Sequence, residues 1–116
     1  MPVVQVHVAP EIAGQAGLKV REIGEIIEQG LISLLSASPD KIQIAIVAAL
    51  DMPKGCQLLV AVDHRASDER PKPIRDELAH QIATQLHGLL GASIRVRLIG
   101  IDPAYISACD IHEAGR

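Results

Sequence analysis

The second residue of the chain is a proline whose nitrogen could act as a base. The sequence begins MPVVQVHV, and cells usually remove an initiator methionine that precedes a small residue. Removal of Met1 would leave Pro2 with a free secondary amine held in place by its ring. An α-amino group has a pKa of about 7.7 to 8.0 in water, and burial in an apolar pocket lowers it. Such an amine is suited to take a proton from a carbon next to a carbonyl group.

A proline at this position also has a purely structural interpretation. Proline is tolerated as the first residue of a strand, because the ladder hydrogen bond that it cannot donate need not exist there. With Met1 still attached, the nitrogen of Pro2 is an amide and cannot be a base. The state of the bond between Met1 and Pro2 therefore separates an enzyme from a scaffold.

Two arginines interrupt an apolar segment near the end of the chain. Arg95 and Arg97 lie in SIRVRLIGI, two residues apart and hence on one face of a strand. Burying an unpaired guanidinium is costly, so these side chains either meet carboxylates at a subunit interface or face a ligand. Because arginine binds carboxylates in a bidentate fashion, both residues are candidate anion binders.

A first β-α-β unit is predicted over residues 2–50. Residues 3–8 alternate between more and less polar positions, which is the period of a strand. A second strand is predicted in KIQIAIVAAL, residues 41–50, after a break at Pro39. Between them, apolar residues at steps of three and four predict a helix that ends near Leu35 and buries Val20, Ile23, Ile27, Leu31 and Leu34.

The same order returns over residues 56–101. The strand QLLVAVD is followed by the loop HRASDERPKP, a helix to about Leu90 that Gly91 closes, and the strand SIRVRLIGI. The two units predict one α+β domain over residues 1–116, with a four-stranded sheet, both helices on one face and a C-terminal tail, residues 102–116. A ferredoxin-like βαββαβ fold has the same element order, so periodicity alone leaves two architectures open.

No predicted helix covers the second face of this sheet. Self-association is the simplest way to bury an aliphatic sheet face, and closed symmetric oligomers are the common solution. We therefore expect a homo-oligomer.

Composition argues against several classes of partner. The chain has no Phe or Trp, a single Tyr and a formal charge of -3, whereas a nucleic-acid groove needs a basic stripe and stacking platforms. The longest apolar runs, such as residues 44–50, are far short of a membrane span, and the N-terminus lacks a signal-peptide pattern. We expect a cytoplasmic protein that binds neither nucleic acid nor membrane.

Metal and cofactor sites are not expected either. Cys56 and Cys109 lack CxxC spacing and predict reduced thiols. His80 and His87 share one predicted helix face without a close third ligand. Asp63 and His64 have no serine or cysteine at a spacing typical of a hydrolase triad.

The stretch Pro2-Val3-Val4-Gln5-Val6-His7-Val8 resembles the start of 4-oxalocrotonate tautomerase. Over roughly residues 2–105, the length, the duplication and the start on proline resemble the fused, double-length members of the tautomerase superfamily. 5-Carboxymethyl-2-hydroxymuconate isomerase and macrophage migration inhibitory factor represent this group. The resemblance implies a homotrimer of duplicated β-α-β units, with Pro2 as the catalytic group.

The resemblance also implies roles for residues of the second unit. Arg95 falls on an arginine that binds the substrate carboxylate, and Arg97 shares its face. Arg65, with Arg70 behind it, matches a second arginine in the loop DHRASDER. Tyr105 lies in the tail, where some relatives place an aromatic residue near the pocket.

Two positions depart from the family pattern. Gln43 is the counterpart of Arg95 in the first unit, and Ser38 replaces the lysine of inhibitory-factor-like members. The chemistry should therefore depend on the second unit.

The resemblance implies a keto-enol tautomerase of small 2-oxo or 2-hydroxydienoate acids, with neutral Pro2 as general base. A cationic proline would instead be a general acid, as in the dehalogenases and decarboxylases of the superfamily. The alternative is an inactive oligomeric scaffold or small-ligand binding module.

Overall fold

A computed structural model describes residues 2–112 and contains two β-α-β units in one domain. The strands are β1 (Val3–Val8), β2 (Gln43–Ala48), β3 (Leu58–Arg65) and β4 (Ile94–Ile101). The helices are α1 (Ala13–Gly17), α2 (Val20–Leu35) and α3 (Lys72–Leu90), with short 3-10 turns at Pro10–Ile12, Pro39–Lys41 and Pro103–Tyr105.

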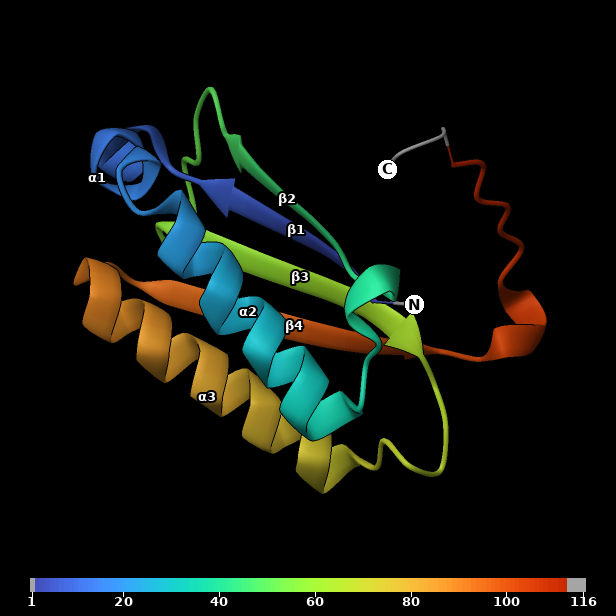
Figure 1. Cartoon of the computed structure of the whole chain (residues 1–116). Helices are drawn as coiled ribbons and strands as arrows, with labels where there is room; N and C mark the ends of the chain where they lie inside the picture. Colours follow the sequence, from blue (N-terminus) through green and yellow to red (C-terminus); the bar gives the residue numbers. More distant parts are fainter. Residues whose placement is uncertain (1, 113–116) are drawn as a thin grey trace.

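The four strands form one mixed sheet in the order β2-β1-β3-β4. Within each unit the two strands are adjacent and parallel, and β1 pairs with β3 in the antiparallel direction. A ferredoxin-like fold is built from split β-α-β units, so adjacency of the two strands excludes that alternative. Helices α2 and α3 lie side by side on one face of the sheet (Figure 1), which confirms the predicted α+β architecture.

The core lies between the sheet and the two long helices. Alternate residues of β1 and β3 point toward the helices, and most of the predicted helix stripes are buried there. The completely buried side chains include Val4, Val6, Leu58, Val60, Val62, Ile23, Ile27, Leu31, Leu78, Ile82 and Leu86. Val20 was predicted in the α2 stripe but is exposed, because it is the first residue of the helix.

Two local features differ from the sequence-based prediction. Helix α1 was not predicted, since its sequence AGQAG has no apolar period. Strand β3 runs two residues beyond the predicted segment, because His64 and Arg65 continue to pair with Gly100 and Ile101 of β4. Gly91 ends α3 as predicted, with a φ of 66° and an N–H that donates to His87 O at 2.7 Å.

In the described part of the chain, the second sheet face carries no helix. The side chains of Val3, Val47 and Ile99 are 37%, 44% and 44% exposed on that face. None of the helices within residues 2–112 is both long and apolar enough to cross a membrane.

Candidate functional site

Pro2 lies immediately before β1 and is buried. Its carbonyl oxygen accepts a hydrogen bond of 3.0 Å from the backbone N–H of Gln43, which continues the pairing of β1 with β2. Val4 and Val6 point toward the helices, and strand alternation places the ring of Pro2 on the same side. The residue with the candidate base is therefore on the covered face of the sheet.

His64 is the cross-strand neighbour of Pro2. In the antiparallel register, Val3 pairs with Asp63 and Val4 pairs with Val62, so the next pair joins Pro2 and His64. Residues that are opposite each other on one sheet face have Cβ atoms about 4.5–5.5 Å apart. His64 is only 2% exposed and continues the buried row of β3.

The imidazole of His64 is neutral and has one free nitrogen. Its Nδ1 lies 2.8 Å from the carbonyl oxygen of Arg65, which can only accept, so Nδ1 carries the hydrogen and Nε2 a lone pair. Burial lowers the pKa of His64, and the positive charges of Arg70 and Arg75 lower it further, while the hydrogen bond to Arg65 opposes this shift. Nε2 is buried and has no hydrogen-bond partner among the residues described.

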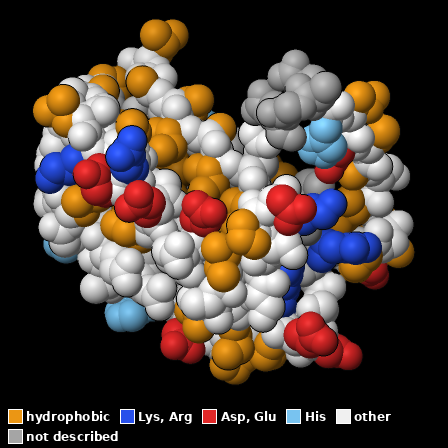
Figure 2. All heavy atoms as spheres, viewed as in Figure 1, with side chains coloured by type: hydrophobic (Ala, Val, Ile, Leu, Met, Phe, Trp, Pro, Cys, Tyr) orange, Lys and Arg blue, Asp and Glu red, His pale blue; other side chains and the backbone are white. Residues whose placement is uncertain are grey.

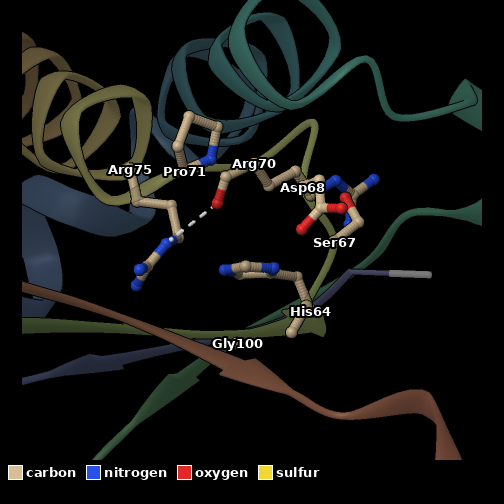
Figure 3. A pocket seen from close by; sticks show the side chains of 8 residues that line it. His64, Ser67, Asp68, Arg70, Pro71, Arg75 and Gly100 are labelled. Atoms are coloured by element: carbon tan, nitrogen blue, oxygen red, sulfur yellow. Dashed lines mark hydrogen bonds between the residues drawn. The ribbon is translucent and has the colours of Figure 1, made fainter.

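His64 forms one wall of a cavity of about 290 Å³ at the end of β3. We call this cavity the His64 pocket (Figure 3); its lining is His64, Ala66, Ser67, Asp68, Arg70, Pro71, Arg75 and Gly100. A Cβ at Gly100 would lie 3.1 Å from Cε1 of His64, so the absence of a side chain there makes room for the ring.

Hydrogen bonds to backbone carbonyls hold two guanidinium groups at the rim. Nε of Arg75 donates to Arg70 O at 3.1 Å, and Arg70 donates to Leu35 O at 3.1 Å and to Arg65 O at 3.3 Å. The ion pair found within residues 2–112 joins Lys72 and Asp76, so neither arginine is paired with a carboxylate there. Such a rim can bind a small anion.

A second cavity of about 280 Å³ adjoins the first and is lined in part by Arg65. The two cavities share Ala66, Ser67 and Arg70 in their walls. Figure 2 shows Lys and Arg side chains gathered on the side of the molecule where β3 ends, with Asp and Glu among them. Arg65 and Arg70, both singled out from the sequence, thus lie at this end of the sheet.

The other predicted binding residues lie elsewhere in the single chain. Arg95 and Arg97 are exposed, and on β4 they pair with Leu59 and Ala61 on the uncovered sheet face. Counted from the rise per residue of a strand, Arg97 lies about 10 Å and Arg95 about 17 Å along the sheet from the level of His64. Tyr105 is 84% exposed in the C-terminal tail. One chain does not bring these three residues to Pro2, and their predicted roles stay predictions.

Two residues of the pocket were missed in the sequence. His64 was considered only as a triad partner of Asp63, although Leu58, Val60 and Val62 extend to it with a period of two. Asp63 is exposed on the opposite face, so the two side chains do not meet. Arg75 gives no signal in the sequence, because an arginine in the first turns of a helix is common.

No protein-family model matches the sequence, and no curated protein matches it. Solved structures do resemble the fold. Native fused 4-OT superimposes with a TM-score of 0.74 at 10% identity, covering 91% of this chain and 91% of that chain. N1, a member of the cis-3-chloroacrylic acid dehalogenase family, has a TM-score of 0.72 at 14% identity, covering 98% and 81%. F6 fused 4-OT, a wild-type asymmetric trimer, has a TM-score of 0.66 at 16% identity, covering 98% and 94%.

Proposed function

From the fold that this chain shares with tautomerase-superfamily structures, we propose that it is a tautomerase or isomerase of small 2-oxo or 2-hydroxydienoate acids. The nitrogen of Pro2 is the general base in the form that lacks Met1, a residue outside the described part of the chain. The observation that carries the proposal is the buried position of Pro2 beside the His64 pocket, whose rim holds two arginines.

The electrostatics of the site favour a base over an acid. Arg70 and Arg75 disfavour a proton on His64, and Pro2 lies beside that residue in the sheet. Nearby positive charge and burial both favour the neutral form of an amine. A neutral Pro2 can take a proton from the carbon next to the carbonyl and return it at another position.

The arginines supply the other half of the reaction. A guanidinium at the rim binds the substrate carboxylate and stabilises the negative charge that develops on the enolate oxygen. The His64 pocket, at about 290 Å³, suits a small acid. Arg70 and Arg75 do this within the same chain, with Arg65 at the adjoining cavity.

We also propose that the active form is a homotrimer. F6 fused 4-OT, which shares the fold, is a trimer, and exposed Val47 and Ile99 lie on the uncovered sheet face. In a trimer, Arg95, Arg97 and Tyr105 of one copy can complete the site of another, which agrees with their exposure in the single chain.

The deciding experiment compares two forms of the protein. One begins at Pro2, as verified by intact mass spectrometry, and the other carries an N-terminal extension that turns the nitrogen of Pro2 into an amide. We expect only the first to speed ketonisation of phenylenolpyruvate or 2-hydroxymuconate, by a factor of about 10²–10⁴ over the blocked form.

Substitution of the base gives a second comparison. Pro2→Ala should lower the rate of the free form, because a primary amine on a flexible residue is less well positioned than the ring nitrogen. Equal activity of the free and blocked forms, or a free form that is inactive on both substrates, would refute the proposal and leave the scaffold alternative.

A further inference from the structure

The free nitrogen of His64 requires a partner that the described residues do not provide. The side chain is 2% exposed, and its Nε2 is buried without a hydrogen bond. Buried polar atoms in folded proteins nearly always have a partner, so an exception requires an explanation, and at the wall of a cavity a bound group can supply it. The His64 pocket is the space in which that partner would lie.

The chemistry of the missing partner follows from the tautomer. Because Nδ1 donates to Arg65 O, Nε2 can only accept a hydrogen bond. A hydroxyl group can donate a hydrogen bond to Nε2. A keto oxygen can only accept, so its lone pairs would be repelled by the lone pair of Nε2. The pocket is therefore suited to a ligand that presents a hydroxyl.

The charges around the ring orient such a ligand. Figure 3 shows Arg75 on one side of the imidazole and Asp68 on the other. Nε of Arg75 is used by Arg70 O, and the terminal nitrogens of Arg75 have no carboxylate partner within residues 2–112. A carboxylate of the ligand is attracted by Arg75 and repelled by Asp68, so it lies on the side of Arg75.

We propose that His64 determines specificity in this pocket by accepting a hydrogen bond from a hydroxyl on the carbon next to the ligand's carboxylate. The ligand class is thus a small 2-hydroxy or enol acid, held by its carboxylate at Arg75. This inference rests on the proposed function in one respect, that the substrate lies in the His64 pocket. Through this hydrogen bond, His64 selects the enol form of the substrate over the keto form.

Three stable acids of similar size test the selection by titration calorimetry: 2-hydroxybutyrate, 2-oxobutyrate and butyrate. We expect 2-hydroxybutyrate to bind the wild-type protein about tenfold more tightly than the other two, the effect of one good hydrogen bond. In His64→Phe the preference should fall to about one, because the ring shape is kept and the acceptor is lost. In Arg75→Gln all three acids should weaken together.

Two controls separate this role from a general effect on folding. His80→Phe makes the same exchange at an exposed histidine of α3 and should keep the preference. Nitrogen NMR of the wild-type protein needs no substitution: 2-hydroxybutyrate should shift the Nε2 resonance of His64, and butyrate should not.

Equal affinity of the wild-type protein for the three acids would overturn the inference, as would a preference that persists in folded His64→Phe. An Nε2 resonance that 2-hydroxybutyrate leaves unchanged would also overturn it and indicate an ordered water as the partner. These measurements record binding and not turnover. An inactive protein that keeps the preference would refute only the proposed function, and an active protein without it would refute only the role of His64.

Discussion

At the scale of single residues, His64 is where stability and chemistry conflict. The apolar row of β3 continues to this position, where an aliphatic or aromatic side chain would fill the same space without an unmet hydrogen bond. Leaving a buried polar atom unpaired costs about 1–3 kcal/mol. Such a cost is typical of functional sites, where local rules of packing are broken for the sake of binding.

The free energy of unfolding should record this conflict as a dependence on pH. The pKa of His64 is lowered from 6.5 by burial and by Arg70 and Arg75, while Asp68 faces the same pocket. As the pH falls below 6.5, the unfolded chain binds the proton first, so wild-type stability should decrease until the pH passes the folded pKa. Urea unfolding of His64→Phe should lack this decrease in stability below pH 6.5. Above pH 7.5 the free energies of unfolding of the two proteins should differ by a constant amount. His80→Phe is the control and should follow the wild type; parallel curves for wild type and His64→Phe would contradict the expectation.

At the scale of elements, α2 packs closely against α3 at Gly30. A Cβ on this glycine would lie 2.8 Å from Cδ1 of Leu78, which is completely buried and has little room to move. Gly24 lies in the same helix with no such atom within 4 Å. Of these two glycines in α2, only Gly30 is required by packing.

Alanine at the two glycines should therefore have opposite effects. Gly30→Ala should destabilise the protein by about 1–3 kcal/mol, the usual cost of overpacking a core. Gly24→Ala should stabilise it by about 0.5–1 kcal/mol, because alanine is the better helix former. Thermal or urea unfolding measures both changes, and a loss of stability in Gly24→Ala or a gain in Gly30→Ala would show that the helix contact is described incorrectly.

The elements were largely predictable from sequence, whereas the site was predictable only in part. Periods of two and of three to four residues are local and predicted the strands and helices of the two β-α-β units, and the glycine at position 91 predicted the end of α3. The neighbour of Pro2 depends on the register between β1 and β3, which no local pattern determines. The sequence therefore indicated Pro2, Arg65 and Arg70 but not that the strand register places Pro2 opposite His64.

At the scale of the whole molecule, the sheet separates the two groups of candidate residues. Pro2, His64 and the pocket arginines lie on the helix side or at the strand end, while Arg95 and Arg97 are exposed on the opposite side. A single chain cannot bring them together across a sheet. In a closed trimer the second copy can supply them, since a cyclic interface joins different surface patches of neighbouring chains.

Mixed trimers test this sharing of the site directly. Pro2→Ala and Arg97→Ala should each be poorly active alone, because one lacks the base and the other an anion binder. If each site takes Pro2 from one chain and Arg97 from its neighbour, unfolding and refolding the two variants together should restore about a quarter of wild-type activity, since chains assort at random. Light scattering must first show a mass three times that of the 12.4-kDa chain. Pro2→Ala mixed with His64→Phe is the matched control: Pro2 and His64 of one site lie in the same chain, so no chain of this mixture carries both residues. Its activity should therefore not exceed the mean of the two separate variants. A trimer whose Pro2→Ala and Arg97→Ala mixture also stays inactive would show that Arg97 does not complete a neighbour's site.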